Sequence, residues 1–252
     1  MEIVFLTALG VGGSTVFGAV IGFVFRSFAR RCADVVTSFA AGVMLAATVI
    51  GLLVPAVEYA TAGIGFVGVF VPVLGIFVGA LFVDLIDMAV PRLTAFMGSG
   101  GEGNDELRRT LLFVIAIAIH NLPEGIAAGV GFGTGNPDEA FLIAGGIALQ
   151  NIPEGMVIIA PMLSAGITPR RTFFYAALTG LVEVLGTFIG YFGISVAGAV
   201  LPFALAFAGG TMLYVINEEM IPSSHTGQFK RGVAYAYLLG FSVIILLDVL
   251  LA

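Results

Sequence analysis

Two short polar segments interrupt apolar stretches of the chain, and they nearly repeat each other. The first, HNLPEG, covers residues 120–125, and the second, QNIPEG, covers residues 150–155. Side chains four residues apart lie on the same face of a helix, so His120 projects beside Glu124, and the second motif repeats this arrangement. Imidazole, carboxylate and amide groups together suit a divalent metal ion of borderline hardness such as Zn²⁺.

The composition indicates that both motifs lie on helices that cross a membrane. Of the 252 residues, 59% are hydrophobic and only 10% are charged, and the mean hydropathy is +1.11. A soluble domain averages about 25% charged residues, so this chain has too few charges to cover a surface in water. In lipid the backbone must satisfy its own hydrogen bonds, and long apolar runs do so as α-helices.

Eight apolar runs are long enough to cross a hydrocarbon core, which takes about 20 residues. We therefore predict an all-α integral membrane protein with eight transmembrane helices, forming a single polytopic domain over residues 1–252. The predicted spans are residues 3–25, 35–58, 61–88, 110–132, 140–166, 172–193, 200–221 and 232–250.

The basic residues predict the orientation of these spans. All ten Lys and Arg residues fall in the loops after the first, third, fifth and seventh spans. Cytoplasmic loops are enriched in Lys and Arg, so we expect these loops in the cytoplasm and both termini outside.

Three carboxylates are predicted to meet near the middle of the membrane. At about 1.5 Å per residue from the span ends, Glu124, Glu154 and Glu183 all lie close to the midplane. Each charge at this depth costs about 2.5–3.5 kcal/mol on insertion scales, and the basic residues are all in loops. Either the glutamates are protonated or a cation compensates them. The amides of both motifs have a second interpretation, as hydrogen bonds between helices that hold no ion.

Glycine spacing predicts tight packing between helices. Four pairs have the G-x-x-x-G spacing that allows close helix contact: Gly18/Gly22, Gly75/Gly79, Gly125/Gly129 and Gly186/Gly190. With 35 glycines in the chain, we take the pattern only as a sign of tight packing.

The paired motifs resemble those of the ZIP (Zrt/Irt-like) metal transporter family, whose fourth and fifth transmembrane helices carry such segments. The similarity extends to residues 41–45, Glu183 and residues 210–222, and the QNIPEG form looks most like the bacterial and GufA-like branch. The resemblance implies a 3+2+3 helix arrangement with an inverted repeat, in a plasma membrane, which is the inner membrane in a Gram-negative cell. It also implies metal movement toward the cytoplasm, typically of Zn²⁺, with Cd²⁺, Fe²⁺ or Mn²⁺ for some members.

The resemblance further implies a two-metal site at the midplane. One ion would be held by Met44, His120, Glu124, Gln150 and Glu154, and the second by Asn121, Asn151, Glu154 and Glu183, with Glu124 as a bridge. Some relatives have Asp where this chain has Asn151, which leaves open whether two ions bind at once.

Five further acids lie near predicted span ends, where they could attract and release the ion. Glu58 is at the outer end of the second span, and the inner ends of the third and seventh spans carry Asp84, Asp87, Glu218 and Glu219. The alternative interpretation is that each is an interfacial acid in contact with water.

Other classes of function have less support. The sequence has no basic stripe of the kind that nucleic-acid binding requires, and it has no H-E-x-x-H motif of the kind found in zinc metalloproteases. We therefore expect that the protein is not an enzyme. Its expected partners are metal ions and the lipid bilayer, and a homodimer is left open. The alternative to metal transport is a proton- or sodium-coupled carrier of another solute, because such carriers also place acids on discontinuous central helices.

Overall fold

The structure is a computed structural model that describes residues 1–26, 32–97, 121–164, 167–196, 198–224 and 230–251. Within these ranges the chain forms helices and no strand, which confirms the predicted all-α class. The α-helices are α1 Glu2–Val24, α3 Ala33–Ala46, α4 Val54–Ile64, α5 Phe70–Met97, α7 Pro137–Ser164, α8 Pro169–Val196, α9 Leu201–Val215, α10 Ile221–Ser224 and α11 Lys230–Leu251. Short 3₁₀ segments cover Gly65–Val69, Phe132–Thr134 and Gly198–Val200.

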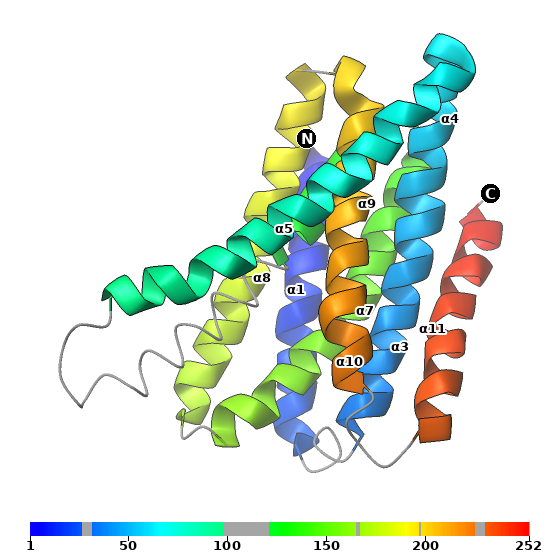
Figure 1. The fold of residues 1–252 in the computed structure, drawn as a ribbon. Helices are drawn as coiled ribbons and strands as arrows, with labels where there is room; N and C mark the ends of the chain where they lie inside the picture. The colour runs from blue at the N-terminus through cyan, green and yellow to red at the C-terminus, as the bar shows by residue number, and fades with distance from the viewer. Residues whose placement is uncertain (27–31, 98–120, 165–166, 197, 225–229, 252) are drawn as a thin grey trace.

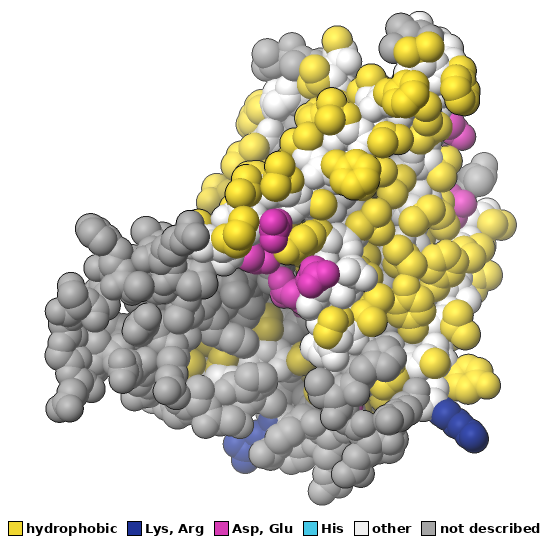
Figure 2. All heavy atoms as spheres, in the orientation of Figure 1, with side chains coloured by type: hydrophobic (Ala, Val, Ile, Leu, Met, Phe, Trp, Pro, Cys, Tyr) yellow, Lys and Arg dark blue, Asp and Glu magenta, His cyan; other side chains and the backbone are white. Residues whose placement is uncertain are grey.

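Seven helical segments of the described chain are long and apolar enough to cross a membrane. Each overlaps one predicted span, and the remaining prediction, residues 110–132, is described only from residue 121, where the chain is helical over residues 121–131. Large hydrophobic side chains such as Phe66 and Phe77 lie exposed on the outside, and hydrophobic side chains cover much of the face shown in Figure 2. The chain is therefore a multi-pass membrane protein.

The helices stand side by side in one bundle, with α5 inclined across its outside (Figure 1). Helix α7 packs against α1 and α3, α5 against α9, and α11 against α3. The start of α1 and the end of α11 lie at the same end of the bundle. The Lys and Arg side chains visible in Figure 2 lie at the opposite end.

Glycine pairs bring helix backbones into direct contact, which confirms the packing that their spacing predicted. A Cβ atom added to Gly18 would lie 2.2 Å from the carbonyl oxygen of Ile152, and one added to Gly129 would lie 2.1 Å from that of Thr187. No side chain fits at such positions, so they fix the distances from α1 to α7 and from helix 121–131 to α8.

Glycine contacts with neighbouring backbones join α1, 121–131, α7 and α8 into one connected set, the first group. The remaining helices, α3, α4, α5, α9 and α11, are called the second group. Within it such contacts join α3 to α11, for example at Gly42 and the carbonyl of Tyr237, and α5 to α9, whereas α9 meets η1 through the Leu53 side chain. Between the groups, Gly51 meets the side chain of Ile143 and Gly146 meets the Cβ of Ala47. The two groups thus meet at these glycines through side chains rather than through backbone carbonyls.

The second and seventh spans both widen into a π-helix shortly before a proline. The π-helical segments are η1 Ala47–Leu53 and η5 Ile216–Met220, and Pro55 and Pro222 follow them. A proline inside a helix lacks an N–H group and clashes with the carbonyl four residues back, and the wider turn accommodates this interruption. Such bulges are rare and often occur at functional sites.

Candidate functional site

The polar residues of both motifs converge in the interior of the first helix group. Helix 121–131 carries Asn121 and Glu124, α7 carries Gln150 and Asn151, and α8 carries Glu183. Each of these side chains is at most 3% exposed. Contact between Gly125 and the carbonyl of Glu183 presses helix 121–131 against α8 at this level. The sequence motifs therefore lie together, shielded from both lipid and water.

One amide–carboxylate contact joins helix 121–131 to α7. The Nε2 atom of Gln150 donates to the Oε1 atom of Glu124 at 2.8 Å. The Oε1 atom of Gln150 and the Oε2 atom of Glu124 have no hydrogen-bond partner.

A second, larger cluster surrounds the Glu183 carboxylate. Its Oε1 atom accepts from the Thr15 hydroxyl at 2.7 Å and from the Asn121 amide, and its Oε2 atom accepts from Asn151 Nδ2 at 2.7 Å. The same Asn151 amide donates to the Val11 carbonyl at 3.3 Å. Because Val11 and Thr15 belong to α1, this one carboxylate links all four helices of the first group.

Three buried oxygen atoms in this region are left without a donor: Glu124 Oε2, Gln150 Oε1 and Asn151 Oδ1. A buried polar group without a partner costs about 1–3 kcal/mol. The two amide oxygens can only accept, and the carboxylate oxygen also only accepts when Glu124 is ionised. The arrangement can therefore accommodate a donor or a cation that it does not itself supply.

The three carboxylates are near one another without forming a closed cage. Glu154 is partly buried on α7, and its charge acts on both Glu124 and Glu183. Even so, no group of three or more His, Cys, Asp or Glu side chains within the described ranges is spaced to hold a metal ion. Different amides donate to the two carboxylates: Gln150 to Glu124, and Asn121 and Asn151 to Glu183.

Two other predicted ligands have different positions. Met44 on α3 is 1% exposed and lies in the adjoining apolar core with Ala127 and Ile147. His120, the predicted imidazole ligand, lies outside the described residues. Met44 is thus the one predicted ligand in the described chain that the second helix group contributes.

Three of the predicted pathway acids gather around one tyrosine. The Tyr214 hydroxyl donates to Asp84 Oδ1 at 2.9 Å, and the charges of Asp87 and Glu218 also act on Tyr214. Figure 2 shows acidic side chains close together on one part of the face that it draws. Glu218 and Glu219 both lie on the π-helical segment η5, where Glu219 is partly buried.

The remaining pathway acid, Glu58, lies exposed on α4, away from the group around Tyr214. The structure brings the acids of the third and seventh spans together and leaves Glu58 apart.

Thr15 was not among the predicted site residues. The only available signal was a hydroxyl near the middle of an uncharged apolar span. Threonine is common there because its hydroxyl can bond a carbonyl in its own helix, so the signal was weak.

Comparison with known proteins identifies the family of this chain. Residues 97–248 match the family described as ZIP Zinc transporter. The chain is 38% identical to zinc transporter GufA of Myxococcus xanthus, over 69% of this chain and 68% of that protein. It is 33% identical to zinc transporter ZIP11 of Homo sapiens, over 94% of each, and 32% identical to zinc transporter ZIPB of Bordetella bronchiseptica, over 93% of this chain and 77% of that protein. The family match covers more than half of the chain, and ZIP11 and ZIPB each align with more than nine-tenths of it, so this protein belongs to the ZIP zinc transporter family.

Proposed function

We propose that this protein moves divalent metal ions, zinc above all, across the membrane toward the cytoplasm through the midplane site of the paired motifs. The relatives named as zinc transporters support the identity of the ion. We also propose that the chain forms a single polytopic domain in the plasma membrane, with eight membrane spans and both termini outside the cytoplasm. The position of the basic residues in alternate loops supports this orientation.

The observation that carries the proposal is the set of buried oxygen atoms without donors. Glu124 Oε2, Gln150 Oε1 and Asn151 Oδ1 accept nothing from the protein. Carboxylate and amide oxygens bind divalent cations, so an arriving ion would satisfy these atoms and offset the charge of the glutamates. Met44, His120, Asn121, Glu154 and Glu183 complete the proposed set of ligands.

Amide donors contact the carboxylates in the structure. The Gln150 and Asn151 amides each donate to a carboxylate at 2.7–2.8 Å. Rotation of an amide would replace its N–H₂ group by its oxygen, and the same side chain would then face a metal ion. The amides thus exchange one role for the other when the ion binds.

Acids at the ends of the spans complete the proposed path. Glu58 would attract cations outside, and the group formed by Asp84, Asp87 and Glu218 around Tyr214, with Glu219 beside it, would receive the ion inside. The convergence of acids from α5 and η5 supports an exit between those elements.

Zn²⁺ uptake into proteoliposomes tests the function. We expect uptake by the wild type and a loss of at least about tenfold in Glu124→Gln, since losing even an outer partner of a metal ligand weakens metal binding by about that factor. Glu2→Gln is the matched control, because Glu2 is exposed in the first turn of α1. If correctly inserted wild type takes up neither Zn²⁺ nor Cd²⁺, the metal proposal is wrong.

Cys32 offers a test of orientation without mutagenesis. It is the single cysteine, it is not in a disulfide and it is partly exposed just before α3. A membrane-impermeant maleimide should label it in inside-out vesicles and not in intact cells. Labelling in intact cells would place this loop outside and reverse the proposed topology.

A further inference from the structure

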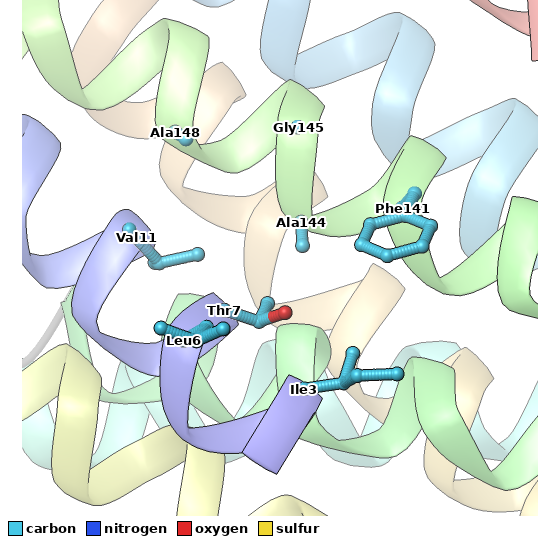
Figure 3. A pocket seen from close by; sticks show the side chains of 9 residues that line it. Ile3, Leu6, Thr7, Val11, Phe141, Ala144, Gly145 and Ala148 are labelled. Atoms are coloured by element: carbon cyan, nitrogen blue, oxygen red, sulfur yellow. The ribbon is translucent and has the colours of Figure 1, made fainter.

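An apolar groove runs between α1 and α7 on the side of the first helix group (Figure 3). Its volume is about 370 Å³, and of the nine described residues that line it only Thr7 has a polar side chain. The side chains of Ile3, Leu6 and Phe141 at its rim are 56%, 60% and 45% exposed. The groove therefore opens onto the surface that faces lipid.

Two glycines leave the groove empty. A Cβ atom added to Gly10 on α1 or to Gly145 on α7 would meet no atom within 4 Å. Further along α1, Gly18 touches the backbone of Ile152, so the two helices meet there and separate toward their N-terminal ends. The bare backbone of Gly10 and Gly145 forms the walls of the resulting gap.

The groove has the length and depth of one leaflet. Ile3 and Phe141 lie near the starts of their helices, and Val11 and Ala148 lie about two turns further in. Eight residues of helix extend about 12 Å, which is close to half of the ~30 Å hydrocarbon core. The groove thus reaches from one membrane surface toward the midplane.

We propose that this groove binds one acyl chain of a phospholipid from the leaflet at the N-terminal end of α1. Its apolar lining excludes a polar ligand, its depth fits one chain, and hydrocarbon is the medium at its rim. Thr7, the one polar side chain of the described lining, lies about 7 Å below the start of α1, partway down the groove.

A bound chain would lie next to the polar cluster. Val11 lines the inner end of the groove, and its carbonyl accepts from the Asn151 amide at 3.3 Å. Asn151 in turn donates to Glu183. The chain therefore packs against the part of α1 that supports the Asn151 and Glu183 side chains.

A tryptophan reporter can test the site, because the wild-type chain contains no tryptophan. Phe141→Trp places one indole at the rim of the groove, and Phe174→Trp places one on the lipid-facing surface of α8, where Phe174 is 62% exposed. Full-length protein stripped of lipid in detergent is titrated with phosphatidylcholine brominated near the carboxyl end of one chain. We expect half-maximal quenching of the Phe141→Trp reporter at a lipid fraction about tenfold lower than for Phe174→Trp, since the groove adds atom contacts that the open surface lacks.

Filling the groove supplies the control. Gly10→Leu with Gly145→Leu, in the Phe141→Trp background, should raise the half-maximal lipid fraction to that of the Phe174→Trp reporter. Gly13→Leu with Gly193→Leu adds the same volume at two exposed glycines outside the groove, where an added Cβ also meets no atom within 4 Å, and should change nothing.

Four outcomes would overturn the proposal. The two reporters could respond to the same lipid fraction, or the filled groove could quench as the open one does. A brominated fatty acid or a second copy of the chain could instead be the occupant. If a second copy of the chain occupies the groove, quenching of the Phe141→Trp reporter by the lipid should be lost in samples in which the protein is dimeric. Light scattering of the same samples measures whether the protein is a monomer or a dimer.

Discussion

Replacing Asn151 by aspartate tests whether amide donors compensate the buried carboxylates. In the wild type the Asn151 Nδ2 atom donates to Glu183 Oε2 at 2.7 Å, and both side chains are completely buried. The Asn151→Asp change keeps the shape and turns this contact into one between two carboxylate oxygens. The metal-free protein should therefore become less stable, and a divalent cation should restore it.

The magnitude follows from the contact that is lost. A hydrogen bond to a charged group contributes about 1.5–3 kcal/mol, and two like charges about 4 Å apart repel by about 4 kcal/mol at an effective dielectric constant of 20. The unfolding free energy without metal should thus fall by several kcal/mol. Zn²⁺ at 100 times its dissociation constant stabilises a folded protein by about 2.7 kcal/mol, which would recover much of the loss.

Thermal unfolding in detergent, followed by size-exclusion chromatography in EDTA or in Zn²⁺, measures both effects. Asn217→Asp is the matched control, because Asn217 also donates an amide to a carboxylate, Glu218, at 2.8 Å, but in an exposed position. The control should melt with the wild type. If Asn151→Asp also melts with the wild type in EDTA, the Glu183 carboxylate does not need this donor. If Zn²⁺ stabilises both proteins equally, the ion does not bind beside Asn151.

Two further substitutions test the packing and the proposed exit. Gly18→Ala would place a Cβ atom 2.2 Å from the Ile152 carbonyl and should lower the unfolding free energy by about 1–3 kcal/mol. The control Gly13→Ala, whose Cβ would meet no atom within 4 Å, should melt at or above the wild-type temperature. Equal melting temperatures for the two variants would refute the packing argument. Tyr214→Phe removes the hydroxyl that donates to Asp84 and should lower the unfolding free energy by about 0.5–1.5 kcal/mol, while Zn²⁺ uptake persists. Loss of uptake in a stable variant would instead assign Tyr214 a direct part in transport.

The sequence predicted those features that depend on periodicity and depth. Uninterrupted apolar runs marked the seven long apolar helices of the described chain. Equal distances from the span ends predicted a common depth for Glu124 and Glu183, which stays a prediction, although the structure buries both side chains. Glycine spacing predicted close contact at Gly18 and Gly129, because only glycine admits a neighbouring backbone at such distances.

Features that depend on tertiary neighbours could not be predicted. Nothing in the sequence places α1 beside both α7 and α8, so neither Thr15 nor the Val11 carbonyl could be assigned to the site. The π-helical segments were also missed, since Pro55 and Pro222 predict an interruption of the helix but not the form it takes. Likewise, the spacing of the motifs does not determine which amide faces which carboxylate.

The division of the helices gives the proposed ligands different mechanical roles. In the described chain, the amides and carboxylates of the site belong to the group formed by α1, 121–131, α7 and α8, where glycine contacts lock the backbones together. Met44 alone belongs to the other group, on α3, and that group meets α7 through side chains, at Gly51 against Ile143 and at Gly146 against Ala47. A displacement of one group against the other would therefore withdraw the Met44 thioether and leave the oxygen ligands in place. The thioether carries no charge, unlike an ionised carboxylate, so among the proposed ligands it is one whose loss would cost a bound cation little electrostatic energy.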